Sequence, residues 1–298
     1  MASHLNILPG DGNDSFKTVA RALTIVENGL KGADELLKGL RFTKKSSIIG
    51  ITGPPGAGKS TLVNALINHM IGSGLKIAVL AIDPTSPFNF GSLLGDRIRM
   101  SAHFNKPDVF IRSLATRGSL GGLSAKTIEM SDVLRAAGFD YIFVETVGVG
   151  QSEVEIAGLA DITMVVLVPE SGDEIQTIKS GLMEIADAFI VNKADRDGAD
   201  TFANNLKKIS QQKNEDVPVF KTIASMSAGI AEIVDFITSA QNIQNTRKEF
   251  LLADKAYKLI TQKRMANVDR QQLREEILEL STNTDFNLYS FVDSYATQ

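Results

Sequence analysis

Short apolar stretches rich in Val and Ile recur along the middle of the chain, and segments with helical character separate most of them. Apolar runs of this length, bounded by polar residues, are typical of buried strands. We predict strands at residues 48–52, 76–83, 141–146, 162–168, 188–192 and 217–224, and helices at residues 59–72, 121–137, 173–186 and 200–213. Because strands that alternate with helices are joined by right-handed crossovers, the predicted fold class is α/β, with a mostly parallel sheet and helices on both faces.

The two ends of the chain follow a different pattern. From Phe16 to Leu30 apolar side chains recur at steps of three and four residues, which predicts an N-terminal amphipathic helix over residues 14–40. After residue 240 the apolar strands stop, and residues 246–266 and 268–281 look helical. Aromatic residues are frequent in the last segment, so this C-terminal extension is either a cap on the sheet or a surface for dimerisation or partner contact.

These patterns divide the chain into three parts: an N-terminal helical segment (residues 1–45), a sheet domain (46–240) and a C-terminal helical extension (241–298). In an open parallel sheet, ligands bind beyond the carboxyl ends of the strands. The motifs that carry chemistry all lie at or after the end of a predicted strand, so we expect one site at that edge.

A glycine-rich loop follows the first predicted strand and precedes a predicted helix. It consists of Gly53, Pro54, Pro55, Gly56, Ala57, Gly58, Lys59 and Ser60. The loop fits G-x-x-x-x-G-K-[ST] at every fixed position, a pattern whose backbone N–H groups and helix N-terminus hold phosphate oxygens. The pattern assigns Lys59 to the β- and γ-phosphates and the Ser60 hydroxyl to Mg²⁺, and we expect Thr61 to contact the α-phosphate. The sequence therefore predicts a P-loop NTPase sheet with Mg²⁺ as cofactor.

A second motif predicts which base is bound. N-K-x-D directly follows a predicted strand and is formed by Asn192, Lys193 and Asp195. The Asp195 carboxylate can accept hydrogen bonds from N1–H and the 2-amino group of guanine, whereas adenine has neither donor and would leave a desolvated carboxylate. The turn that matches the O6-contacting loop of GTPases is formed by Ser227, Ala228 and Gly229. We therefore expect GTP as substrate and GDP as product.

Acidic residues at strand ends and in one loop complete the predicted site. Asp83 and Glu145 end predicted strands, and Asp96 lies in the loop GSLLGDRIRM. Magnesium in nucleotide sites takes few carboxylates together with waters and phosphate oxygens. We predict that these three residues hold Mg²⁺ with Ser60, directly or through water.

The residue that orients the attacking water is left open by the sequence. GTPases commonly carry D-x-x-G here, but Glu145 replaces the aspartate and Val149 stands where small GTPases carry a glutamine. Gln151 is the alternative, and we expect slow intrinsic turnover. Four arginines are candidates for charge stabilisation, although a structural role is favoured for each: Arg97, Arg99, Arg112 and Arg117.

Composition limits the remaining functions. The 298 residues are 43% hydrophobic, with a formal net charge of −4 and no cysteine. These values argue against binding to nucleic acid or anionic membranes and exclude thiolate chemistry. No signal peptide and no apolar stretch long enough to span a bilayer are visible, so we expect a cytoplasmic protein. The histidines His4, His69 and His103 form no ligand cluster, which disfavours a nickel-type metallochaperone.

Together these residues resemble one family, the methylmalonyl-CoA mutase-associated GTPases of the MeaB/ArgK type. The matching stretches are GITGPPGAGKSTL, VLAIDPTSP, GSLLGDRIRM, GFDYIFVETVGVGQSE and VNKAD, over roughly residues 15–240. The resemblance is specific, because DPTSP, LLGDRIRM and ETVGVGQSE are not general features of P-loop proteins.

The resemblance implies GTP hydrolysis coupled to loading and protecting the cobalamin cofactor of an acyl-CoA mutase. It also implies a homodimer formed through helical extensions, and catalytic roles at Lys59, Asp83, Asp96 and Glu145.

Residues 84–100 and 146–153 would then be switch segments ordered by the γ-phosphate and Mg²⁺. Three alternatives remain: a metallochaperone GTPase, an ArgK-type kinase of a transport system, and a non-enzymatic protein that binds GTP only as a structural ligand.

Overall fold

The computed structural model describes residues 13–83, 100–103, 106–115, 125–146, 156–170, 180–212, 217–240, 248–282 and 285–296. The chain forms two compact units, Met1–Lys255 and Ala256–Gln298. The predicted domain boundary after residue 240 falls at a stretch outside the described residues. The first unit contains the sheet and the sequence motifs, and each unit is considered by itself.

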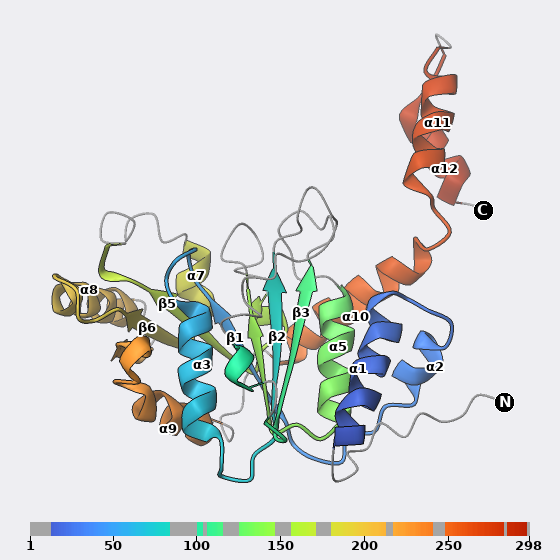
Figure 1. The fold of residues 1–298 in the computed structure, drawn as a ribbon. Helices are drawn as coiled ribbons and strands as arrows, with labels where there is room; N and C mark the ends of the chain where they lie inside the picture. The colour runs from blue at the N-terminus through green and yellow to red at the C-terminus, as the bar shows by residue number, and fades with distance from the viewer. Residues whose placement is uncertain are drawn as a thin grey trace. The chain divides into compact units, whose positions relative to one another are not determined.

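The described part of the first unit contains a sheet of seven parallel strands in the order β3-β2-β4-β1-β5-β6-β7 (Figure 1). Their bounds are β1 (Ser47–Thr52), β2 (Ile77–Asp83), β3 (Val109–Ala115), β4 (Tyr141–Glu145), β5 (Ile162–Leu167), β6 (Ala188–Asn192) and β7 (Val219–Thr222). β1 lies at the centre between β4 and β5, so the carboxyl ends of these strands share one edge. The predicted α/β class with a parallel sheet is confirmed.

Helices cover both faces of this sheet. In the first unit they are α1 (Asn13–Glu27), α2 (Ala33–Lys38), α3 (Lys59–Met70), α5 (Ala125–Ala136), α7 (Ser180–Ile185), α8 (Ala199–Gln212) and α9 (Ile230–Ala240), and α10 (Lys248–Arg264) follows. Buried side chains of α1, α5, α7 and α8 belong to one core, and those of α3 and α9 to the other. Ile48 belongs to the first core and Ile49 to the second, because successive strand side chains point to opposite faces. Burial on both faces explains why the central strands are almost continuously apolar.

Two elements of the sheet domain are absent from the sequence prediction. The edge strand β3 was not predicted, because Arg112 and Ser113 interrupt its apolar pattern. Helix α9 was not predicted either, although its buried residues Ile230, Ile233 and Ile237 recur at helical spacing. Both elements lie at the margins of the domain, where runs of consecutive apolar residues are shorter than in the central strands.

The predicted N-terminal helix over residues 14–40 is two helices, α1 and α2. Gly29 and Gly32 lie between them with φ angles of 58° and 95°, and glycine in this region commonly ends a helix. Leu23 and Val26 of α1 are fully buried in the first core. The N-terminal helix is therefore part of the hydrophobic core of the sheet.

Three aspartates that directly precede strands make the same contact at the amino edge of the sheet. Asp140 pairs in this way with Lys76, Asp161 with Ile48, and Asp187 with Thr163. In each pair the aspartate donates its backbone N–H at 2.8 Å. Its Oδ2 accepts the partner's backbone N–H, at 2.9, 2.9 and 2.7 Å respectively. The carboxylates thus satisfy amide groups at the starts of three strands.

We expect Asp161→Ala to lower the free energy of unfolding by about 1–3 kcal/mol, because the amide N–H of Ile48 would lose its acceptor. Asp161→Asn is the matched control, since an amide oxygen can still accept this hydrogen bond. Urea unfolding followed by circular dichroism measures the difference. Equal stability of the alanine variant and the wild type would show that water replaces the carboxylate without loss.

The second unit contains α11 (Arg270–Leu280) and α12 (Leu288–Ala296), and none of its described side chains is buried. Helices α10 and α11 confirm the helical character predicted for residues 246–266 and 268–281, over the described residues 248–264 and 270–280. The rings of Phe286 and Phe291 lie 6.2 Å apart between centroids, and those of Phe291 and Tyr295 lie 5.5 Å apart. The large apolar side chains that remain exposed in this unit are Tyr257, Ile260, Met265, Leu278, Leu280, Leu288, Tyr289 and Val292.

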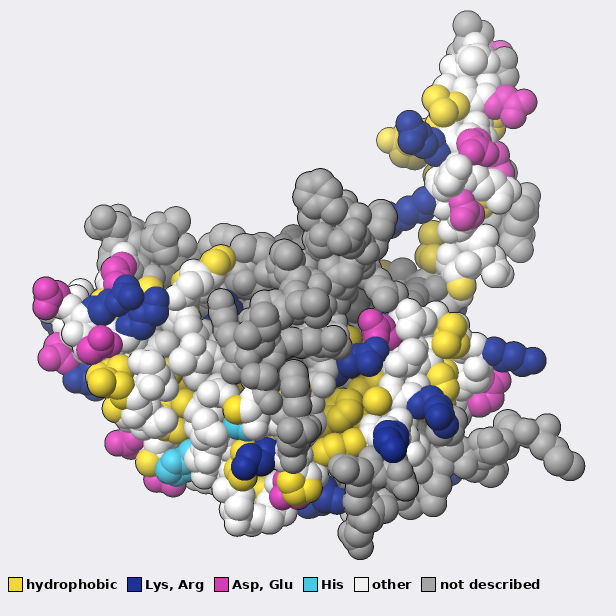
Figure 2. All heavy atoms as spheres, viewed as in Figure 1, with side chains coloured by type: hydrophobic (Ala, Val, Ile, Leu, Met, Phe, Trp, Pro, Cys, Tyr) yellow, Lys and Arg dark blue, Asp and Glu magenta, His cyan; other side chains and the backbone are white. Residues whose placement is uncertain are grey.

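Charged side chains of both signs are interspersed over the described surface of the first unit in the view of Figure 2. This mixture agrees with the small formal net charge of −4. Within the described part of the chain, no helix has the length and apolar character required to cross a membrane.

Candidate functional site

The phosphate loop connects the end of the central strand β1 to the first turn of α3. Gly53, Gly56 and Gly58 have φ angles of 136°, 78° and 88°, a region that residues with a Cβ rarely adopt. A Cβ at Gly53 would overlap the carbonyl oxygen of Val166 on β5, and a Cβ at Gly58 would overlap the side-chain nitrogen of Asn192. Glycine is therefore required where the loop approaches β5 and the N-K-x-D motif.

Lys59 is the first residue of α3 and its side chain is held against the loop. The residue is only 6% exposed. Its Nζ donates hydrogen bonds to the carbonyl oxygens of Gly53 at 2.8 Å and Pro54 at 3.1 Å. A buried ammonium group needs such partners, because its desolvation is otherwise costly. These bonds keep the cation beside the backbone that the motif assigns to phosphate.

Ser60 and Glu145 come from different elements and meet beside the loop. Ser60 lies in the first turn of α3 and Glu145 ends β4, and both are buried. The Ser60 hydroxyl donates to Oε1 of Glu145 at 2.7 Å. A hydroxyl and a carboxylate oxygen are hard ligands of the type Mg²⁺ prefers, so this donor set fits the predicted metal. Thr61 follows in the same helical turn and is partly buried.

Of the other two predicted metal ligands, Asp83 and Asp96, the structure describes the position of Asp83 only. Asp83 ends β2, two residues beyond Ala81, which pairs in register with Glu145. The backbone of Asp83 therefore lies at the same edge of the sheet as Glu145. Asp96 lies outside the described residues, as do Val149 and Gln151 and nearly all of the two hypothesised switch segments.

Asn192 connects the phosphate loop to the turn that follows β7. The residue is 2% exposed, and its Nδ2 donates to the carbonyl oxygen of Ala57 at 2.9 Å. Its Oδ1 accepts the Thr222 hydroxyl at 3.2 Å and the backbone N–H of Ala224 at 3.1 Å. One buried amide thus joins three segments that are far apart in sequence.

The next residues of N-K-x-D extend this connection. Lys193 has a φ angle of 56°, and its Nζ donates to the carbonyl oxygen of Gly56 at 2.8 Å. The backbone N–H of Ala194 donates to the carbonyl oxygen of Thr222 at 3.0 Å. Asp195 is exposed, so its carboxylate is accessible from solvent. The motif is therefore anchored by its first three residues and open at its fourth.

The turn predicted to contact the base is closed by its own backbone hydrogen bonds. The backbone N–H groups of Ser227 and Ala228 donate within the turn, to the carbonyl oxygens of Ala224 at 3.2 Å and Ile223 at 3.3 Å. Gly229 has a φ angle of 71°, and a Cβ there would overlap the backbone of β7. The segment next to Asn192 is residues 222–224 at the end of β7.

The sequence reasoning missed Thr222 and Ala224. The available signal was position: Thr222 ends β7 and pairs in register with Asn192, which ends β6. Since ligands bind at the carboxyl ends of parallel strands, the end of β7 was a further position to consider beside the triplet at residues 227–229.

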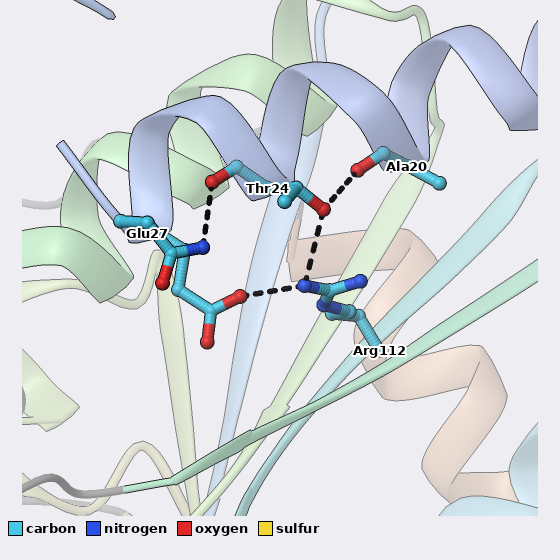
Figure 3. Close-up of polar contacts among 5 residues, drawn as sticks. Ala20, Thr24, Glu27 and Arg112 are labelled. Atoms are coloured by element: carbon cyan, nitrogen blue, oxygen red, sulfur yellow. Dashed lines mark hydrogen bonds and ion pairs between the residues drawn. The ribbon is translucent and has the colours of Figure 1, made fainter. Parts of the chain in front are cut away.

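Arg112, one of the four arginines considered for charge stabilisation, connects β3 to α1 (Figure 3). Its Nη2 donates to Oε2 of Glu27 at 2.6 Å and to Oγ1 of Thr24 at 3.4 Å. The Thr24 hydroxyl in turn donates to the carbonyl oxygen of Ala20 at 2.9 Å. Arg112 therefore has the structural role that the sequence favoured, and the other three arginines lie outside the described residues.

His103, in the 3₁₀ helix η1 (Ser101–His103), is buried against α3. Its Nε2 lies 2.6 Å from Oδ1 of Asn64. Burial lowers the pKa of His103, and the positive charge of Lys106 lowers it further. Among the residues that the structure describes, no group of three or more His, Cys, Asp or Glu side chains is arranged to hold a metal ion.

A family model described as Methylmalonyl Co-A mutase-associated GTPase MeaB matches residues 19–281. The chain belongs to this family. The MeaB match extends into the C-terminal extension, which the sequence motifs did not reach. The chain is also 45% identical over 295 residues to a predicted GTPase from Pyrococcus abyssi, covering 93% of this chain and 91% of that protein.

Two further similarities place this MeaB-family chain among known proteins. A crystal structure of an LAO/AO transport system kinase is similar with a TM-score of 0.64 and 26% identity, covering 94% of this chain and 92% of the other. The fused isobutyryl-CoA mutase of Geobacillus kaustophilus is 36% identical over 229 residues. That match covers 70% of this chain but 21% of the mutase, so the similar segment is a minor part of the longer protein.

Proposed function

We propose that this MeaB-family GTPase hydrolyses GTP in a Mg²⁺-dependent reaction, and that hydrolysis is coupled to loading and protecting the cobalamin cofactor of an acyl-CoA mutase. The observation that carries the proposal is the direct connection between the two nucleotide motifs. Asn192 donates to Ala57 and Lys193 donates to Gly56, so N-K-x-D is bonded to the phosphate loop. A loop suited to phosphates and a motif suited to guanine therefore belong to one site.

The phosphate groups are assigned to the loop and to the start of α3. Backbone N–H groups in the positive-φ loop and at the helix N-terminus attract anions, because both present partial positive charge. Lys59 adds a full positive charge beside the carbonyl oxygens of Gly53 and Pro54. Binding of the β- and γ-phosphates then requires the Lys59 ammonium to share or exchange these two hydrogen bonds.

Mg²⁺ is assigned to Ser60 and Glu145, with Asp83 and Asp96 as further ligands, directly or through water. When bound, the ion neutralises phosphate charge and stabilises the charge that develops during transfer. The Ser60 hydroxyl donates its hydrogen bond to Glu145, which leaves the lone pairs of the serine oxygen available to a cation. The two buried residues are thus prepared for the metal before the nucleotide binds.

The guanine base is assigned to Asp195 and to the turn at residues 222–229. N1–H and the 2-amino group are assigned to the exposed Asp195 carboxylate, and O6 is assigned to the turn. The backbone N–H groups of Ala224, Ser227 and Ala228 donate within the protein, so binding of O6 requires one of them to exchange its hydrogen bond. We include Ala224 with Ser227, Ala228 and Gly229, because Asn192 joins Ala224 to the phosphate loop.

The link to an acyl-CoA mutase rests on the family and on one relative. The family description names methylmalonyl-CoA mutase, and a similar segment forms part of a fused isobutyryl-CoA mutase. From this fusion we infer that the present chain binds an acyl-CoA mutase as a separate protein. The homodimer is supported by the large apolar side chains that are exposed among the described residues of the second unit.

The proposal is tested with the full chain and a cobalamin-dependent acyl-CoA mutase. We expect Mg²⁺-dependent hydrolysis of GTP, and a complex whose stability differs between GDP and a non-hydrolysable GTP analogue, because coupling between two ligands is reciprocal. Size-exclusion chromatography with light scattering measures the complex, and for the chain alone should give twice 32.2 kDa. Absence of hydrolysis contradicts the enzymatic part, and a complex insensitive to the nucleotide contradicts the coupling.

A further inference from the structure

Two buried threonines join the phosphate loop to the strand that carries Glu145. Thr52 ends β1 and directly precedes Gly53, and Thr146 directly follows Glu145 at the end of β4. Thr52 is 0% exposed and Thr146 is 2% exposed. The Thr146 hydroxyl donates to Oγ1 of Thr52 at 3.0 Å. The backbone N–H of Thr146 also donates to the carbonyl oxygen of Ile51, at 3.0 Å.

This contact continues the pairing of β1 and β4 beyond the last residues in register, Ile51 and Glu145. Two sets of contacts therefore position Glu145. The next residue, Thr146, is hydrogen-bonded to β1, and the Glu145 carboxylate accepts a hydrogen bond from the Ser60 hydroxyl of α3. A ligand side chain needs such support, because a displacement of a few tenths of an ångström weakens a metal site.

We propose that Thr52 and Thr146 are positioning residues for the metal site. Their hydroxyl–hydroxyl bond fixes the end of β4, places the Glu145 carboxylate on Ser60, and thereby strengthens binding of Mg²⁺ in the nucleotide complex. The inference rests on the proposed Mg²⁺-dependent function and adds residues that act through Glu145 without touching the nucleotide themselves.

Thr146→Val tests this inference, because valine has nearly the same shape but cannot form the hydroxyl bond. We measure how the affinity for fluorescently labelled GDP increases with Mg²⁺ concentration. The Mg²⁺ concentration for the half-maximal increase should rise about fivefold to tenfold. The affinity in EDTA should change by less than about twofold, since the phosphate loop and N-K-x-D are intact.

Further variants separate this role from a purely structural one. Thr146→Ser retains a hydroxyl and should restore the wild-type Mg²⁺ dependence. Thr52→Val should reproduce the shift, and the double valine variant should not exceed it, because both changes remove the same bond. Thr163→Val replaces another buried threonine of the same sheet and should leave the Mg²⁺ dependence unchanged.

Thermal unfolding of each variant accompanies these titrations. A Thr146→Val variant that is less stable but keeps the wild-type Mg²⁺ dependence overturns the inference. If this variant does not fold, the Mg²⁺ dependence of Thr52→Val tests the inference in the same way. A wild-type chain whose GDP affinity does not respond to Mg²⁺ overturns the proposed function itself, which distinguishes the two failures.

Discussion

Asp195→Asn is expected to change the base preference of the site from guanine to xanthine. In the proposed complex the carboxylate accepts two hydrogen bonds from guanine, and an asparagine amide would place a donor against the guanine 2-amino group. Xanthine carries an oxygen at that position, so the amide can donate to it. Sites that lose pairing of this kind reject the wrong ligand by roughly 10⁴-fold. The change is measured by competition. Unlabelled GDP and xanthosine diphosphate (XDP) each displace fluorescently labelled GDP from the wild type and labelled XDP from the variant.

The control for this prediction lies two residues further along the same loop. Asp197→Asn removes an equal charge from an exposed position and should leave the preference for guanine intact. Comparison of the two variants therefore separates base recognition from the general effect of charge. If Asp195→Asn retains its preference for GDP, then the base is recognised elsewhere in the protein.

The parallel sheet could be predicted because its central strands are buried on both faces. A strand such as β1, with Ile48 in one core and Ile49 in the other, must be apolar at successive positions, and this run is visible in the sequence. The edge strand β3 has no such requirement. It carries Arg112, which is satisfied by Glu27 on a helix that is distant in sequence. The apolar pattern is therefore informative at the centre of the sheet and weak at its edge.

The candidate site was predictable as a set of motifs but not as a set of contacts. The phosphate-loop motif consists of eight consecutive residues, so Lys59 and Ser60 could be assigned from a short stretch of sequence. The partners of Asn192 could not, because they depend on the register of β6 against β7 and on the path of the phosphate loop. For this reason the contact between Asn192 and Ala224 was not predicted, while Ser227, Ala228 and Gly229 were chosen because they match a GTPase loop and follow a predicted strand.

Contacts between residues that are distant in sequence join the parts of the site to one another. Asn192, Lys193 and Thr146 each connect a strand end to the phosphate loop or to the residues that precede it. A change at the base side can therefore alter the phosphate side through the buried hydrogen bond of Asn192 to Ala57, because a buried hydrogen bond is worth more than an exposed one. This arrangement suits a protein in which nucleotide state has to be communicated to a partner.

Lys59→Ala is expected to abolish detectable GTP hydrolysis. The ammonium is the charged group that the structure holds against the phosphate loop, at 2.8 Å from the carbonyl oxygen of Gly53 and 3.1 Å from that of Pro54. Loss of one preorganised donor aimed at developing charge typically lowers kcat by about 10²–10³-fold. Loss of a full positive charge should lower the rate of GTP hydrolysis by at least this factor. Single-turnover hydrolysis of radiolabelled GTP measures the rate.

Folding must be separated from catalysis in this experiment, because Lys59 is buried and its two hydrogen bonds shape the loop. The alanine variant leaves two carbonyl oxygens to water, which can enter a surface loop, so we expect the sheet to remain folded. Lys207→Ala on the exposed face of α8 removes an equal charge and should hydrolyse GTP at the wild-type rate. A folded Lys59→Ala variant with wild-type hydrolysis would show that phosphate is held elsewhere, and the assignment of Ser60 and Glu145 to the metal would lose its basis.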